Sequence, residues 1–245
     1  MKERVIITGY SGSLASKTRK LLKDNYEIIG LTSNKKKINN KDIYFWNPSI
    51  DEMDEKALEN CKHIIHLSGY PILKCWTNKN KRLMHESRIR ASNLLFNKCK
   101  KLHISPITFI SASAIGIYGL NAKGAKYEND KMGIDWVASM VSDWEESAKQ
   151  FKQIGSRVIQ MRISLLINKE TAFFKYNLLS MKLGVGVIIG SKEKKINWIH
   201  VDDAANFIKE AITNKNYQGA YNLATENPIS QGMFIKKIKE KLFPY

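Results

Sequence analysis

Residues 4–15 read RVIITGYSGSLA and decide the fold. A short β-rich run leads into two spaced glycines, and residues with helical periodicity follow. Gly9 permits a tight turn, Gly12 lets the backbone approach a pyrophosphate, and the next helix offers free N–H groups with a favourable dipole. Ala15 stands where a third glycine often allows close helix packing. An ordinary strand-to-helix turn is the alternative, but this context favours a dinucleotide site formed by Gly9, Tyr10, Ser11, Gly12, Ser13 and Leu14.

The rest of the chain alternates strand-like runs with amphipathic helices, which predicts a parallel sheet with right-handed crossovers. We expect an α/β fold: a Rossmann-type doubly wound parallel sheet with a small C-terminal substrate-facing lobe. Residues 1–165 would form the NADP-binding core, and residues 166–245 would form mainly the lobe and closing helices of the same unit. The predicted strands are 4–8, 26–32, 43–46, 63–68, 107–111 and 157–163, and the predicted long helices are 79–102 and 140–153.

The end of the second strand indicates which dinucleotide is bound. NAD enzymes usually present a carboxylate there to the ribose hydroxyls. This chain instead has Ser33, Asn34 and Lys35, followed by two more lysines. Hydroxyl, amide and ammonium groups accept a 2′-phosphate that a carboxylate would repel, so NADP is favoured over NAD. The alternative is a solvated basic loop.

The charge of the chain suggests a phosphate-rich partner at first sight. Its 245 residues include 40 Lys and Arg against 23 Asp and Glu, for a net charge of +17. These lysines are scattered over helix faces and loops, and no nucleic-acid motif accompanies them. We therefore expect a solvated basic surface and no specific nucleic-acid partner.

Two further absences restrict the class of protein. No apolar run approaches the roughly 20 residues that span a bilayer, so no membrane association is expected. The three cysteines, Cys61, Cys75 and Cys99, show no CxxC spacing, which fits a reducing compartment better than disulfides or a zinc site. We expect a cytoplasmic protein without a bound metal.

The order of short motifs along nearly the whole chain resembles the extended short-chain dehydrogenase/reductase superfamily. Within it, the chain is similar to the atypical "epimerase family" group, often described as NAD-dependent epimerase/dehydratase-like. Each motif alone is weak, but their order is specific. The motifs are Thr8 to Ala15, HLSG at 66–69, Trp76-Thr77, Glu86-Ser87-Arg88, SASAIGIYG at 111–119, Asp143-Trp144-Glu145, Arg162 and WIHVDD at 198–203.

This resemblance implies how the ligand crevice is lined. Leu67, Ser68 and Gly69 would pass beside the cofactor ribose, and Ser111, Ala112 and Ser113 would lie near the nicotinamide. The carboxyl ends of parallel strands are the expected place for such a crevice in any case. Arg88 and Arg162 are counted among the cofactor-binding residues. For Arg88, a surface ion pair with Glu86 or another acid is an equal alternative.

The chain departs from the superfamily at its proton relay. Short-chain dehydrogenases normally carry a Tyr-x-x-x-Lys pair in which the lysine lowers the tyrosine pKa. When Glu145 is aligned with the acid that follows this pair, the two positions fall on Val137 and Val141. Neither valine can move a proton, although Ser113 still matches the family serine.

Three other titratable residues are candidates to replace the missing acid: Tyr118, Tyr127 and His200. Tyr118 could equally wall the cofactor pocket. His200 titrates near neutral pH and could act as acid or base, but it precedes a helix that Asp202 or Asp203 can cap, so a structural histidine is the favoured alternative. Ser113, Tyr118 and His200 are the residues expected to be catalytic.

Three classes of function fit these patterns. The leading one is an NADP-dependent oxidoreductase or epimerase-like enzyme acting on a small polar substrate. The second is a non-catalytic NADP-binding sensor or scaffold that lacks the Tyr-x-x-x-Lys pair. The third is a nucleic-acid-associated protein. The chain stops at Tyr245, earlier than related proteins commonly do, so a homodimer could complete the substrate wall.

Overall fold

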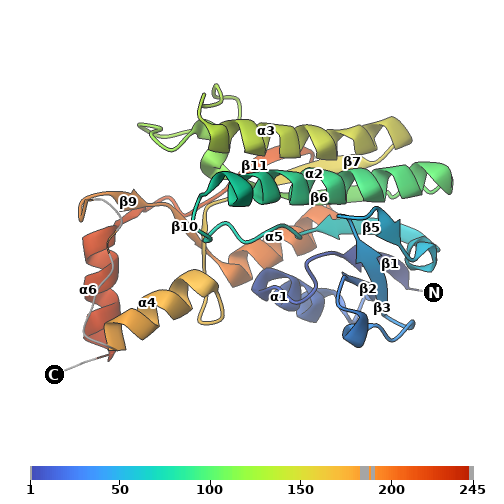
Figure 1. Ribbon diagram of the computed structural model, residues 1–245, viewed down its shortest axis with the longest axis horizontal. Coiled ribbons are helices and arrows are strands. Elements are labelled where there is room, and N and C mark those ends of the chain that lie inside the picture. The colour runs from blue at the N-terminus through green and yellow to red at the C-terminus, as the bar shows by residue number, and fades with distance from the viewer. Residues whose placement is uncertain (1, 183–187, 189–190, 243–245) are drawn as a thin grey trace.

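The computed structural model describes residues 2–182, 188 and 191–242, and a largely parallel sheet runs through it (Figure 1). Among these residues the sheet has eight strands, and only β4 runs antiparallel to its neighbour. The Rossmann-type α/β architecture predicted from the sequence is confirmed. From edge to edge the strands are β11 (Gly219–Leu223), β7 (Arg157–Ile163), β6 (Thr108–Ala114), β5 (Cys61–His66), β1 (Glu3–Ile7), β2 (Tyr26–Thr32), β3 (Ile43–Asn47) and β4 (Glu52–Met53).

The strand order reverses between β1 and β5. From β1 the chain proceeds outward to β2 and β3, whereas β5, β6 and β7 follow on the opposite side. The carboxyl ends of β1 and β5 therefore flank the switch point, where open α/β sheets bind their ligands. The loops that leave these two strands begin at Thr8 and Leu67.

Helices cover both faces of the sheet (Figure 1). On one face, α1 (Ser13–Leu22) packs against α5 (Val201–Thr213), and their apolar stripes share one core cluster. On the other face lie α2 (Asn78–Lys101) and α3 (Trp136–Lys149). The helices pack in this way because apolar residues recur at helical spacing, which places one apolar stripe of each helix against the strands.

Polar side chains fix where these helices begin. The Thr77 hydroxyl accepts a hydrogen bond from the Asn80 amide at the start of α2, and Asp135 accepts from two amides at the start of α3. At α5 the structure corrects the sequence prediction. The cap is His200, whose Nδ1 lies 3.3 Å from the Asp202 amide nitrogen, because Asp202 already lies inside the first helical turn. After α3, η4 (Gln150–Ile154) ends at Gly155, which has the left-handed backbone conformation typical of a helix C-cap.

Part of the chain after residue 165 packs on the sheet. Helix α5 lies against it as a closing helix, and β11, a strand that the sequence analysis did not predict, extends it beside β7. The sequence pattern does not predict β11, because GAYNL has no clear apolar alternation. The remaining elements include α4 and α6, which stand apart from the sheet in Figure 1. In chain order, these remaining elements are β8 (Leu165–Ile167), α4 (Ala172–Lys182), β9 (Lys195–Ile196), β10 (Trp198–His200), β12 (Ile229–Ser230) and α6 (Gln231–Leu242).

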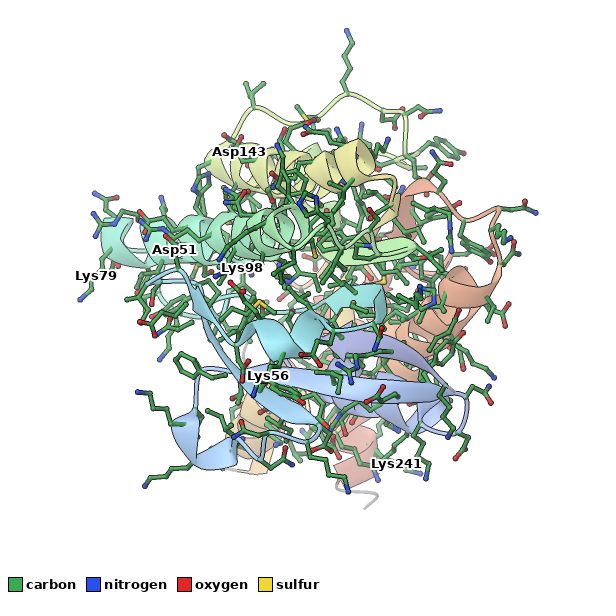
Figure 2. The ribbon with its side chains drawn as sticks, turned by 90° about the vertical axis from the view of Figure 1, so that its right-hand side faces the viewer. Asp51, Lys56, Lys79, Lys98, Asp143 and Lys241 are labelled. Carbon is green, nitrogen blue, oxygen red and sulfur yellow. The ribbon has the colours of Figure 1, made fainter. Side chains whose placement is uncertain are left out.

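None of the helices in the described part of the chain is long and apolar enough to cross a bilayer. The lysines that Figure 2 labels come from three elements: Lys56 from η2 (Glu55–Leu58), Lys79 and Lys98 from α2, and Lys241 from α6. Lys98 and Lys101 are both paired with Glu55.

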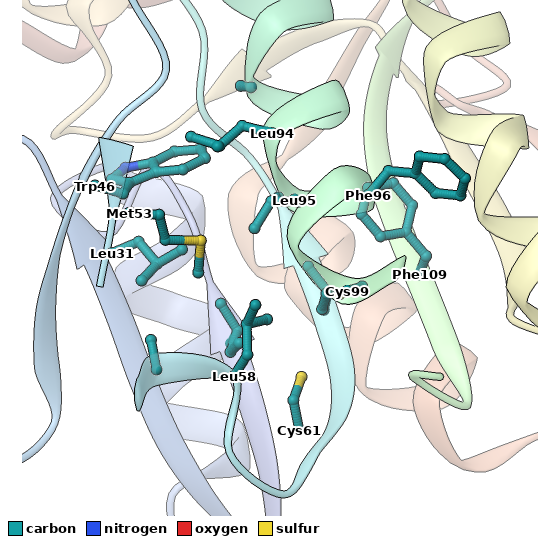
Figure 3. Close-up of a cluster of buried hydrophobic side chains, with 14 of the residues drawn as sticks. Leu31, Trp46, Met53, Leu58, Cys61, Leu94, Leu95, Phe96, Cys99 and Phe109 are labelled. Carbon is teal, nitrogen blue, oxygen red and sulfur yellow. The ribbon is translucent and has the colours of Figure 1, made fainter. Parts of the chain in front are cut away.

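The largest core cluster lies between the sheet and α2 (Figure 3). Leu94, Leu95 and Cys99 of α2 meet Leu31 of β2 and the neighbouring η2 (Glu55–Leu58) in this cluster. At its far side the rings of Phe109 and Phe151 stack with centroids 3.7 Å apart. Burial of these side chains stabilises the packing of α2 on the sheet.

The Phe109 stack provides a test of this core. Replacing Phe109 by Ala should lower the free energy of unfolding by about 3–5 kcal/mol, because the ring is fully buried and its loss leaves a cavity. Ile107→Ala, two residues earlier on the same segment and 47% exposed, should cost about 0.5 kcal/mol or less. Urea unfolding of both variants measures the difference; equal costs would contradict this account of the core.

Candidate functional site

The glycine turn after β1 is pressed against the loop that follows β5. Gly9 has φ +64°, and a Cβ there would stand 2.7 Å from the carbonyl oxygen of Leu67. The Gly12 amide donates to the Gly9 carbonyl at 2.8 Å, which closes the turn. Only glycine meets both demands at position 9, since other residues rarely adopt this φ and any side chain would collide.

A buried hydroxyl ties the same two loops together. Thr8 Oγ1 accepts hydrogen bonds from the amides of Leu67 and Ser68, at 3.0 and 3.2 Å. Because these bonds occupy both lone pairs, the Thr8 hydrogen points to His66 Nδ1, 2.9 Å away. Burial lowers the pKa of His66 to about 4, so the ring is neutral and accepts this bond.

The start of α1 can receive an anion. Gly12 is the N-cap and brings no side-chain hydrogen bond to the helix end. The first intrahelical bond runs from Ser16 to Gly12. The amides of Ser13, Leu14 and Ala15 therefore have no carbonyl within the helix to bond, and the helix dipole adds positive potential.

Tyr10 serves the turn by packing rather than by polar contact. Its ring lies against Gly30 of β2, where a Cβ would meet the ring at 2.4 Å. The Arg19 guanidinium covers the other side at 3.9 Å from the ring centroid. Leu14 is buried beneath the turn. These contacts fix the turn on β2 and α1.

The end of β2 places a lysine beside the turn, although a different one from that predicted. Asn34 caps η1 (Lys35–Lys37), and Lys35 lies over the Phe45 ring. Lys37 Nζ instead donates to Ser11 Oγ at 3.1 Å. One turn of 3₁₀ helix carries the third lysine back toward the glycines, which spacing in the sequence did not reveal.

A cavity of about 460 Å³ opens next to these groups. It lies between the ends of β2 and β3, the loop after β5 and the first half of α2. Its volume falls in the range of small-molecule sites. Among the described residues, Ser68 Oγ is buried without a hydrogen-bond partner. The lining includes Ser33, Trp46, Ser68, Gly69, Tyr70 and Arg90.

Arg88 lies beneath this loop, and the ion pair with Glu86 that the sequence left open does not form. It is 9% exposed and donates to the carbonyls of Met84 and Tyr70, at 2.7 and 3.2 Å. Glu86 faces Arg82 and Arg90 instead. No carboxylate of the described chain pairs with Arg88, and burial lowers its pKa to about 10. It therefore supports the loop at Gly69 from below.

A polar row crosses three strands at the other half of the crevice. Ser113 of β6, Arg162 of β7 and Asn222 of β11 are register partners. Glu145 of α3 lies over the row: it accepts from Ser113 Oγ at 2.6 Å and from Arg162 at 2.8 and 3.0 Å. Burial opposes the charge on Arg162, but the hydrogen bonds and charge of Glu145 outweigh it and raise the Arg162 pKa.

Tyr118, at the end of η3 (Ile115–Tyr118), completes this row. Its hydroxyl accepts from Arg162 Nη1 at 2.9 Å and donates to Asn222 Oδ1 at 2.8 Å. Arg162 also donates to the carbonyl of Glu128. The sequence motifs named Ser113, Tyr118, Glu145 and Arg162 separately; strand pairing brings them together. Arg162 is thus bound to protein groups, whereas the sequence reading placed it on the cofactor.

The two positions of the missing proton relay form an apolar wall. Val137 and Val141 lie on α3 in a cluster with Met84, Ile117 and Tyr118. A Cβ on Gly116 would stand 2.8 Å from a methyl of Val137. A valine side chain carries no titratable group, so no proton donor stands at these two positions.

The other predicted site residues are more dispersed. Ser111 is buried and its hydroxyl bonds the Ala112 carbonyl, and Ala112 is also buried in β6. Tyr127 is 69% exposed. His200 caps α5 and lies 3.6 Å from Asp202, which in turn pairs with Lys17 of α1. Within the described part of the chain, His200 thus belongs to the start of α5 and not to the polar row.

Comparison with known proteins agrees with this architecture. In solved structures, the chain superposes on human epimerase family protein SDR39U1 (isoform 2) with NADPH at a TM-score of 0.82 and 19% identity, covering 98% of this chain and 80% of that one. It matches the nucleoside-diphosphate sugar epimerase from Corynebacterium glutamicum at a TM-score of 0.80 and 24% identity, over 99% of this chain but 51% of that longer one.

Sequence relatives align with most of this chain. The chain is 30% identical over 246 aligned residues to the chloroplastic SDR39U1 homologue of Arabidopsis thaliana, an epimerase family protein, covering 96% of this chain and 69% of that one. It is 28% identical to epimerase family protein SAR0825 of Staphylococcus aureus, covering 95% and 78%. The model of the NAD dependent epimerase/dehydratase family matches residues 5–224. With its glycine turn, switch-point crevice and strand order, the chain belongs to the NAD dependent epimerase/dehydratase family, as an atypical short-chain dehydrogenase/reductase.

Proposed function

We propose that this protein is an NADP-dependent oxidoreductase of the atypical short-chain dehydrogenase type, acting on a small molecule. The observation that carries the proposal is the open start of α1 beside a glycine turn held against Leu67. The amides of Ser13 and Leu14 would receive the pyrophosphate, and Ser68, whose buried hydroxyl has no partner in the described chain, would bond a ribose hydroxyl. The bound nicotinamide would supply the redox chemistry.

NADP is proposed over NAD because of the charge at the end of β2. Lys37 lies 3.1 Å from Ser11, and Ser33 lines the adjoining cavity. Residues 32–37 contain no carboxylate. An ammonium and two hydroxyls favour a phosphate at this place, whereas NAD enzymes use an acid there. The human relative of the same fold was solved with NADPH, which supports the same choice.

Among the three catalytic candidates, Tyr118 has the best placement to exchange a proton with a substrate. Its hydroxyl joins the row at the carboxyl ends of β6 and β7 and receives a bond from Arg162. Ser113 donates its hydrogen to the buried carboxylate of Glu145, whereas Tyr118 donates to the neutral amide of Asn222, and a bond to a charged acceptor is the harder one to exchange. His200 contributes to the start of α5 instead.

A second function has specific support: an NADP-binding sensor or scaffold without turnover. The valines at positions 137 and 141 and the engaged hydroxyl of Ser113 remove the usual proton relay. Purified protein should be assayed for retained nucleotide, and then for oxidation of NADPH against a panel of aldehydes, ketones and quinones. Turnover that falls at least tenfold in Tyr118→Phe supports the enzyme. Tight NADPH binding with no turnover supports the sensor.

We also propose a cytoplasmic location, on the ground that Cys61, Cys75 and Cys99 are all free thiols and two of them are buried. Free buried thiols are typical of proteins kept in reducing compartments.

The role of Lys37 gives a direct prediction. Wild-type protein should bind NADPH at least tenfold more tightly than NADH, about 1.4 kcal/mol. Lys37→Ala should lose most of that preference by weakening NADPH alone, since only NADPH carries the 2′-phosphate. Lys36→Ala is the matched control and should keep the preference. Titration by fluorescence or calorimetry measures all six dissociation constants, two for each protein; equal affinities for the two nucleotides in wild-type protein would refute the NADP assignment.

The glycine turn gives a second prediction. Gly9→Ala should abolish measurable NADPH binding, because the methyl would strike the Leu67 carbonyl and displace the turn. Gly155→Ala is the control: it has φ +82°, a comparable backbone cost of about 1–2 kcal/mol, but open space around a Cβ.

Both glycine variants should melt at a lower temperature than wild type, and only Gly9→Ala should lose the rise in melting temperature that NADPH produces. If Gly9→Ala still binds NADPH with wild-type affinity, the turn is not the pyrophosphate site.

A further inference from the structure

Two loops at the polar-row half of the crevice carry a concentration of exposed apolar side chains. One is segment 70–77, which follows the β5 loop, and the other is segment 119–135, which joins η3 to α3. Loops usually present polar side chains to water, and adjoining exposed apolar residues mark binding surfaces. We call these side chains the apolar rim: Ile72, Leu73, Trp76, Leu120, Tyr127, Met132 and Ile134.

The two loops are held together and in place. Trp76 meets Trp136 edge to face with ring centroids 4.9 Å apart, and its indole N–H donates to the Ile72 carbonyl. At the base of segment 119–135, the Gly133 amide donates to the Ile117 carbonyl, and Asp135 accepts from the Leu120 amide at 2.7 Å. The rim is therefore a built surface, anchored at both ends of each loop.

The rim is continuous with the candidate site. Trp136 directly precedes Val137, the position of the missing proton donor, and Tyr70 packs in the same cluster as Val137 and Tyr118. Segment 119–135 is also fastened to the polar row, because Glu128 accepts from the Asn222 amide at 2.7 Å. A molecule on the rim would lie beside the carboxyl ends of β6 and β11.

The charges of the rim do not favour a sugar. Glu128, Asp130 and Asp135 all accept hydrogen bonds from backbone amides of the protein, so these carboxylates are engaged. Sugar hydroxyls need several free polar partners, and the exposed neutral polar side chains of the two segments are Thr77, Asn121 and Asn129; the other exposed side chains are chiefly apolar or lysine. Lys81, for example, lies over the Trp136 ring.

We propose that the apolar rim is the substrate-binding surface and that the substrate is an apolar small molecule with an aromatic ring. This inference rests on the proposed function and replaces the small polar substrate expected from the sequence. Aromatic side chains such as Trp76 and Tyr127 offer ring faces and edges for stacking, and burial of apolar area supplies the affinity.

The test uses the full chain and a fluorescent aromatic probe, anilinonaphthalene sulfonate, displaced by neutral naphthol or by UDP-glucose. The variants are Leu73→Asp and Ile134→Asp, two exposed rim positions where the fold should tolerate the change. The matched control is Ile107→Asp: Ile107 is 47% exposed, close to the 53% of Leu73, but precedes β6 at the opposite end of the sheet. Melting temperatures and NADPH affinity are measured on the same preparations.

We expect naphthol, but not UDP-glucose, to displace the probe. Leu73→Asp and Ile134→Asp should each weaken probe binding about five- to tenfold, and Ile107→Asp should change it less than about twofold. NADPH affinity should stay at the wild-type value in all three. Displacement by UDP-glucose alone, or equal loss in Ile107→Asp, would overturn the proposal. So would a wild-type dimer, seen by light scattering, that Leu73→Asp converts to monomer.

The two proposals fail separately in this experiment. If probe binding follows the expected pattern while wild-type protein does not bind NADPH, the cofactor assignment fails and the proposal for the apolar rim still stands. If NADPH binds and the rim variants match wild type in probe binding, only the rim proposal fails.

Discussion

The contact between Gly9 and the Leu67 carbonyl is the constraint on which the crevice depends. It brings together the ends of β1 and β5, the two strands between which the sheet reverses direction. The Thr8 hydroxyl, directly after β1, accepts a hydrogen bond from the Leu67 amide of the loop after β5 and donates its own hydrogen to the neutral ring of His66. A side chain at position 9 would separate these loops, and the start of α1 would turn away from the cavity beside β2.

The second half of the crevice is organised by a buried ion pair instead. A carboxylate and a guanidinium removed from water cost several kcal/mol each unless their hydrogen bonds are satisfied. Here Glu145 accepts from Ser113 and twice from Arg162, while Arg162 also reaches Tyr118. The pair therefore joins β6, β7 and α3 into one rigid unit. It also removes two of the polar groups that a reacting substrate could otherwise contact.

Local patterns were sufficient for six strands of the sheet and for the glycine turn, but not for β4 and β11. Strands 26–32 and 157–163 were predicted at their observed bounds, because continuous β-rich runs between turn residues specify them. The prediction failed where distant segments decide the outcome. Strand β11 is defined by its pairing with β7, and the lysine beside the turn is Lys37 rather than Lys35 because a 3₁₀ turn redirects it. The sequence motifs identified Arg162 as a site residue. Its hydrogen-bond partners became apparent only from the pairing of β6 and β7 in the structure.

Arg88 has a consequence for how ligands arrive. Its guanidinium is buried beneath the Gly69 loop and has no carboxylate partner in the described chain, so its positive charge is balanced by carbonyl dipoles and by the face of the Trp144 ring, 4.9 Å away. Low-dielectric surroundings weaken the screening of such a charge, and its field extends into the adjoining cavity. A polyanionic nucleotide should thus be drawn in from a distance, with an association rate that falls as ionic strength rises.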